Sequence, residues 1–216
     1  MRYIVLDTET TGLDPDDGHK IIEIGCIEII DRKVTDNTFH KYLNPKREID
    51  VEASKVHGLT ASNLSDKPVF EDIYSEFLTY ISDSPLIIHN APFDIGFLKK
   101  EFSYIQSANS FFTNEIIDSL KLARKISPGK KNTLDALCER YSVDNSDRNL
   151  HGALLDARLL AFVYLKLTIG QNDFAELTSE NNINIRNEIN SSEEFKVIYA
   201  SPEDVDLHDN YFKKSN

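Results

Sequence analysis

Cysteine, tryptophan and methionine are scarce in this chain of 216 residues, which has two cysteines, no tryptophan and one methionine. Neither Cys26 nor Cys138 has a partner at metal-ligand spacing, so both are predicted to be packed thiols of a reducing compartment. Long apolar runs are also missing: none approaches the ~18–20 residues of a membrane span, and no signal-peptide pattern opens the chain. The sequence therefore predicts a soluble, cytoplasmic protein without membrane contact.

Positive charge is in short supply as well. Lys and Arg number 24 against 36 Asp and Glu, a net charge of −12. Residues 171–216 hold ten acids and four bases, so this short segment alone contributes −6. Nucleic acid is held mainly through Lys and Arg. A chain with this balance is expected to grip DNA weakly by itself and to depend on a partner.

The order of apolar runs predicts one α/β domain over residues 1–170, with a mixed sheet flanked by helices. Residues 171–194 are rich in Asn, Glu and Ser without apolar periodicity, which predicts a flexible linker. Residues 195–216 contain a small apolar island, which predicts a segment that folds against a partner. Expected strands span 2–12, 20–30, 34–43, 85–89 and 115–117; expected helices span 51–56, 68–82, 95–102, 118–125, 133–141 and 152–168.

Two acids stand near the end of the first expected strand. Side chains of a strand alternate between its faces, so Asp7 and Glu9 point the same way, with Cα atoms about 6.6 Å apart. Two carboxylates at that spacing can converge on divalent cations held about 3.5–4 Å from each other, as two-metal phosphodiester chemistry requires. The alternative is a solvated strand end, where acids are common.

Three further candidates lie at the starts of two expected helices. Asp94 follows a buried strand, where α/β sheets present ligands, although an acid there also stabilises the helix dipole. Asp156 shares a face with apolar residues, so its charge needs a metal ion or, alternatively, a buried arginine. His151, just before that helix, can take a proton from water near neutral pH; alternatively it is a helix-start residue bonded to a carbonyl.

Three motifs carry a family resemblance: D-T-E-T-T-G-L at 7–13, H-N-A-P-F-D-I-G-F-L at 89–98 and H-G-A-L-L-D at 151–156. Together they resemble the DnaQ-like DEDDh 3′→5′ exonucleases, in which a histidine stands five residues before the last acid. The resemblance extends over residues 1 to about 170 toward the proofreading subunits of bacterial DNA polymerase III, through V-H-G-L at 56–59 and P-G-K-K-N-T-L-D-A-L-C-E-R-Y at 128–141.

The resemblance implies an RNase H-like fold and hydrolysis of the 3′-terminal phosphodiester of DNA to 5′-mononucleotides. It implies two Mg²⁺ or Mn²⁺ ions as cofactors and His151 as the general base. It also implies the polymerase α subunit as partner of the C-terminal segment, and a small θ-like subunit as a further partner. The implied metal ligands are Asp7, Glu9, Asp94 and Asp156, and the implied substrate-binding residues are Asp7, Glu9, Thr10, Glu52, His57 and Asp156.

Two features leave alternatives open. The family's clamp-binding pattern is reduced here to Gln171–Glu176 without its final aromatic residue, which argues against contact with a sliding clamp. Basic residues between 121 and 131 either meet the phosphate backbone or form a solvated face. The alternatives for the whole chain are a stand-alone DEDDh RNase of the oligoribonuclease or tRNA-trimming type, and a non-catalytic assembly subunit. The basic residues are Lys121, Arg124, Lys125, Lys130 and Lys131.

Overall fold

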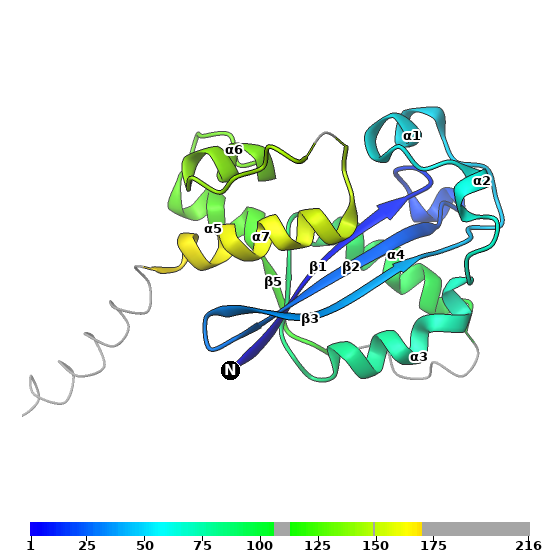
Figure 1. Cartoon of the computed structure of the whole chain (residues 1–216), viewed down its shortest axis with the longest axis horizontal. Coiled ribbons are helices and arrows are strands. Elements are labelled where there is room, and N and C mark those ends of the chain that lie inside the picture. The colour runs from blue at the N-terminus through cyan, green and yellow to red at the C-terminus, as the bar shows by residue number, and fades with distance from the viewer. Residues whose placement is uncertain (106–112, 149, 170–216) are drawn as a thin grey trace, which may run out of the picture. The chain divides into compact units, whose positions relative to one another are not determined.

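The computed structural model describes residues 1–105, 113–148 and 150–169 (Figure 1). Its sheet has the order β3-β2-β1-β4-β5, with β1 (Arg2–Thr10) at the centre. Strands β2 (Ile21–Ile30) and β3 (Lys33–Tyr42) are antiparallel, whereas β4 (Leu86–Ile88) and β5 (Ile116–Asp118) are parallel to β1. The predicted mixed α/β fold is therefore confirmed. The predicted linker and C-terminal segment, 171–194 and 195–216, lie outside the described residues.

A tight turn between β2 and β3 sets the register of this hairpin. Asp31 and Arg32 have φ angles of 47° and 62°. Two successive residues with positive φ form the hairpin turn whose twist matches that of the strands. It lies between the two strands that the sequence predicts at 20–30 and 34–43. It pairs Ile30 with Lys33, so the chain returns from β2, which is buried except at Ile30, into the partly exposed β3.

Helices cover both faces of the sheet (Figure 1). On one face, α3 and α4 pack against Ile4 and Leu6; on the other, α5, α6 and α7 pack against Val5. Because successive side chains of β1 point to opposite faces of the sheet, this strand contributes to both hydrophobic cores. The helices are η1 (Pro15–Asp17), α1 (Val51–His57), α2 (Ala61–Leu64), α3 (Phe70–Ile81), α4 (Pro92–Ser103), α5 (Ser119–Ile126), α6 (Leu134–Arg140) and α7 (Ala153–Leu167).

Some boundaries differ from those expected. Helix α3 begins at Phe70 and not at 68, because Val69 is extended and its N–H donates to the Asp72 carboxylate 3.2 Å away. The short helices η1 and α2 were not expected. Helix α2 is only four residues long, too short for apolar periodicity, and a capping box between Thr60 and Asn63 stabilises its start.

Helix α7 packs directly against Gly25 in β2. A Cβ atom on Gly25 would lie 2.3 Å from the backbone carbon of Ala153 and the backbone nitrogen of Leu154. Only glycine therefore allows the first turn of α7 to rest directly on the sheet. Gly25 is the register partner of Asp7, so this contact brings the start of α7 beside the acidic end of β1. None of the helices in the described part of the chain is long and apolar enough to cross a membrane.

Candidate active site

Strand β1 delivers two acids to the α7 face of the sheet. Asp7 and Glu9 follow Val5 at intervals of two, and both line a cavity of about 840 Å³. Burial, followed by the carboxylates of Asp94, Glu9 and Asp156, raises the pKa of Asp7 well above its usual value. Burial, followed by the carboxylates of Asp156, Glu23 and Asp94, raises the pKa of Glu9 to about 8. The site therefore holds several carboxylates close together with little solvent around them, which favours binding of a cation.

Asp94 reaches the same cavity from the opposite layer. It stands in the first turn of α4, directly after β4, and its side chain is buried. The Thr8 hydroxyl, on the α4 face of β1, donates to Asp94 Oδ1 at 2.7 Å. Burial raises the pKa of Asp94 to about 7, although the hydrogen bond from Thr8 opposes the rise. Asp94 therefore lies at a helix start, as expected, and lines the cavity with the other acids.

Asp156 lies in the first turn of α7 and is also buried. Both of its oxygens accept hydrogen bonds from Arg148: Nε to Oδ1 at 2.6 Å and Nη2 to Oδ2 at 2.6 Å. The buried arginine, one of the two alternatives for this acid, is thus observed. Because Asp156 still lines the cavity with the other acids, the arginine pair does not remove it from the candidate site.

His151 precedes α7 and keeps 45% of its side chain exposed. Its backbone N–H donates to the Val56 carbonyl at 3.0 Å, which ties the end of α1 to this segment. In the alternative interpretation, His151 is a helix-start residue bonded to a carbonyl. The backbone N–H makes this bond, so the imidazole ring is not needed for it and lines the cavity. Burial, followed by the Arg148 charge, lowers the pKa of His151, so the ring is neutral and able to accept a proton at neutral pH.

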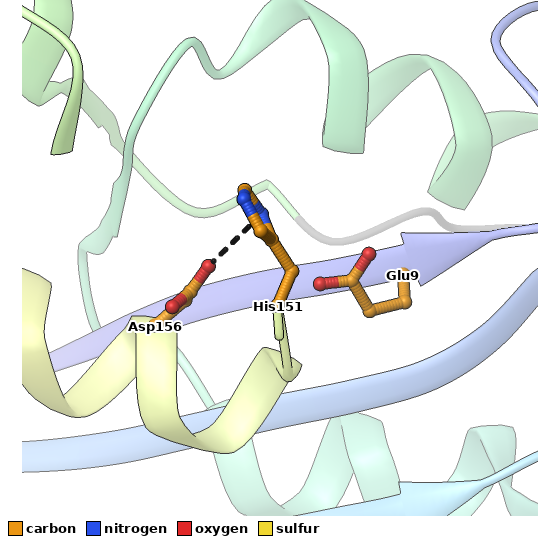
Figure 2. Close-up of side chains that lie close together, drawn as sticks. All are labelled: Glu9, His151 and Asp156. Carbon is orange, nitrogen blue, oxygen red and sulfur yellow. Dashed lines mark ion pairs between the residues drawn. The ribbon is translucent and has the colours of Figure 1, made fainter. Parts of the chain in front are cut away.

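Figure 2 shows Glu9, His151 and Asp156 pointing toward one another from β1, the loop before α7 and α7. One ligand atom of each lies within 4.8 Å of the others, and His151 Nδ1 is 3.5 Å from Asp156 Oδ2. Carboxylate oxygens suit hard divalent cations such as Mg²⁺ and Mn²⁺, and the crowded acids match their charge. Asp7 and Asp94 line the same cavity without belonging to this group of three.

The other expected substrate residues lie outside the lining of this cavity. Thr10 is buried and its hydroxyl donates to the Gly12 carbonyl at 2.6 Å, whereas Glu52 is exposed and pairs with Lys55. His57 is buried at the end of α1, where burial lowers its pKa. Its Nε2 atom is buried and has no side-chain hydrogen-bond partner among the described residues.

Several residues of the cavity carried no individual signal in the sequence. Arg148 is the clearest, because nothing in the spacing of Arg148 and Asp156 distinguishes this arginine from others. The basic run divides: three of its five members, Arg124, Lys130 and Lys131, line the cavity. The remaining lining residues are Thr8, His89, Asn90, Phe93, Leu120, Asn132, Thr133, Leu134 and Asp135.

Comparison with known proteins agrees with this geometry. The RNase T family model, described as Exonuclease, matches residues 4–164, and the chain belongs to this RNase T/DnaQ-like family. The DNA polymerase III subunit epsilon of Buchnera aphidicola subsp. Schizaphis graminum is 50% identical over 224 residues, covering 99% of this chain and 96% of that protein. The Escherichia coli K12 subunit of the same name is 46% identical, covering 96% and 90%. The chain is thus a 3′→5′ exonuclease of the polymerase III epsilon type.

Solved structures share the fold. The structure titled Exonuclease X in complex with 5′ overhanging duplex DNA superposes with a TM-score of 0.63 at 29% identity, covering 77% of this chain and 90% of that one. The nuclease domain of 3′hExo, described as a DEDDh family member bound to rAMP, superposes with a TM-score of 0.67 at 17% identity, covering 77% and 90%. The second likeness shows the fold alone.

Proposed function

We propose that this chain removes nucleotides from the 3′ end of DNA for a bacterial polymerase III and releases 5′-mononucleotides. The observation that carries the proposal is the convergence of four acids and one histidine on one cavity. These residues come from β1, α4 and the start of α7, which are far apart in the sequence. Such an arrangement supports phosphodiester hydrolysis assisted by divalent cations.

Two divalent cations, Mg²⁺ or Mn²⁺, are the proposed cofactors, and Asp7, Glu9, Asp94 and Asp156 would hold them. Bound cations of this kind supply Lewis-acid stabilisation of the attacking and leaving oxygens. The protein itself supplies the base: His151 takes a proton from the attacking water at its exposed ring edge. Placement of His151 beside Glu9 and Asp156 supports this role because the proton is then accepted next to the cation-binding acids.

The cavity wall also offers a path for the DNA backbone. Arg124, Lys130 and Lys131 line the same cavity as the acids and would contact phosphates. For the terminal nucleotide, we propose contacts from Thr10, Glu52 and His57, as the family resemblance implies. The Nε2 atom of His57, which has no side-chain partner among the described residues, supports a polar contact from that residue.

Partners and place in the cell belong to the same proposal. Residues 1–170 would form the exonuclease domain, 171–194 a flexible linker and 195–216 the segment that binds the polymerase α subunit in the cytoplasm. The relatives named DNA polymerase III subunit epsilon support it, because the alignments extend over nearly the whole chain. A θ-like small subunit is a further proposed partner, and the shortened pattern at 171–176 argues against a clamp contact.

The purified chain tests the proposal directly. Single-stranded DNA labelled at its 5′ end should shorten stepwise from the 3′ end in the presence of Mg²⁺ or Mn²⁺, with mononucleotides as products. An RNA oligonucleotide of the same sequence should be degraded more slowly. Asp7→Asn is the matched control and should abolish the reaction. Faster cleavage of RNA would favour the stand-alone RNase, and no cleavage by the wild-type chain would favour an assembly subunit.

A further inference from the structure

Arg148 occupies an unusual position in the cavity wall. Its guanidinium uses all three nitrogens: Nε and Nη2 bind the two oxygens of Asp156, and Nη1 binds Asp135 Oδ1 at 2.7 Å. Nη2 also lies 3.0 Å from Nδ1 of His151. The side chain is only 6% exposed. The Arg148 guanidinium therefore contacts both a proposed metal ligand and the proposed base.

The contact with Asp156 is a two-point ion pair, the strongest geometry available to arginine and a carboxylate. It engages both oxygens of the acid, so any divalent cation that uses Asp156 must share this carboxylate with the guanidinium or displace it. Asp135 holds the third nitrogen from the exposed side and itself accepts from Asn145 Nδ2 at 3.1 Å. The guanidinium thus has a second acid to stay on when Asp156 turns elsewhere.

We propose that Arg148 is the built-in counter-cation of Asp156 and lowers the affinity of the site for divalent cations by competing for this carboxylate. The inference rests on the proposed metal site. The same competition couples the acid to the base, because the nitrogen that holds Asp156 Oδ2 also donates to His151 Nδ1.

Removal of the positive charge alone is the first test, through Arg148→Met, which retains the apolar length of the side chain. Calorimetric titration with Mn²⁺ should give a dissociation constant at least about tenfold lower than that of the wild type, because a competing unit charge in contact with the ligand is gone. Arg124→Met is the matched control: it removes a charge from the same cavity lining, and its dissociation constant should change by less than about threefold.

Thermal unfolding separates competition from a merely structural role. In EDTA, Arg148→Met should unfold at a lower temperature than the wild type, because Asp156 loses its partner. Saturating Mn²⁺ should restore most of this difference, since the dication supplies the missing charge. If the variant does not fold in EDTA, Arg148→Met/Asp156→Asn should fold, because the second substitution removes the unpaired carboxylate.

The outcomes of these tests distinguish failure of the inference about Arg148 from failure of the proposed function. Equal or weaker Mn²⁺ binding by Arg148→Met overturns the inference and makes Arg148 a residue that orients Asp156 for the metal. Failure of the double variant to fold, or a stability loss that Mn²⁺ does not reduce, also overturns it. A wild-type chain that binds Mn²⁺ and degrades DNA while Arg148→Met binds no tighter refutes the inference alone. A wild-type chain that binds no divalent cation refutes the proposed function as well.

Discussion

Stability without divalent cations should fall as pH rises, and Glu9 should account for much of the fall. The pKa of Glu9 is about 8 in the folded protein, against 4.5 for a free glutamate, because the side chain is buried among other acids. The folded state therefore binds a proton that the unfolded state has already released. The stabilising effect of this proton is complete below pH 4.5 and is lost as pH rises through about 8.

The magnitude follows from the two pKa values. At about 1.4 kcal/mol for each tenfold change in proton affinity, the difference corresponds to roughly 5 kcal/mol. This is an upper limit, because Asp7 and Asp94 share the same repulsion and part of the cost moves to them. Glu9→Gln should thus raise the free energy of unfolding by roughly 2–5 kcal/mol at pH 8 and by much less at pH 5.

Urea denaturation in EDTA at pH 5, 6, 7 and 8 measures this effect. Glu48→Gln, a change at an exposed acid, is the control and should run parallel to the wild type. Asp156→Asn should behave in the opposite way and lose stability at every pH, because it leaves the buried Arg148 with a weaker partner. A wild-type stability that stays level or increases from pH 5 to 8, or a Glu9→Gln curve parallel to it, would refute the reasoning.

Four further outcomes are expected. His151→Ala should lower single-turnover hydrolysis by about 10²–10⁴ with little change in Mn²⁺ affinity by calorimetry; an equal loss of affinity would make His151 a ligand. Gly25→Ala should displace α7 and lower both the melting temperature and the turnover, because its Cβ has no room beside Ala153. Lys131→Gln should raise KM and reduce the salt slope of DNA binding by about 0.7–1, whereas an unchanged slope would place Lys131 off the DNA path. A chain ending at Gly170 should degrade free oligonucleotides at the full rate but fail to co-purify with the polymerase subunit; retained binding would contradict the proposed role of the tail.

Short-range patterns were enough to predict much of the fold. The alternation of β1 placed Asp7 and Glu9 on one face, and the patterns at 20–30 and 34–43 predicted strands β2 and β3. The same reasoning placed Asp94 at the start of α4. Each of these features depends on neighbours within a few residues, which a sequence displays directly.

Contacts made across the fold were harder to predict. The need of Asp156 for a positive partner follows from its apolar helix face, but the identity of that partner, Arg148, depends on the path of the loop before α7. In the same way, charge alone could not show that Lys130 and Lys131 line the cavity while Lys121 does not.

The contact of α7 with Gly25 also has a consequence for how the chain is made. Asp7 emerges from the ribosome early, but Asp156 can join it only when α7, the last described helix, has been synthesised and has docked on the sheet. Domains fold as units as the chain is produced, starting from the N-terminal side. A nascent or prematurely ended chain therefore holds only part of the acid set. The proposed role of Asp156 therefore predicts that a chain ending before α7 does not hydrolyse nucleic acid.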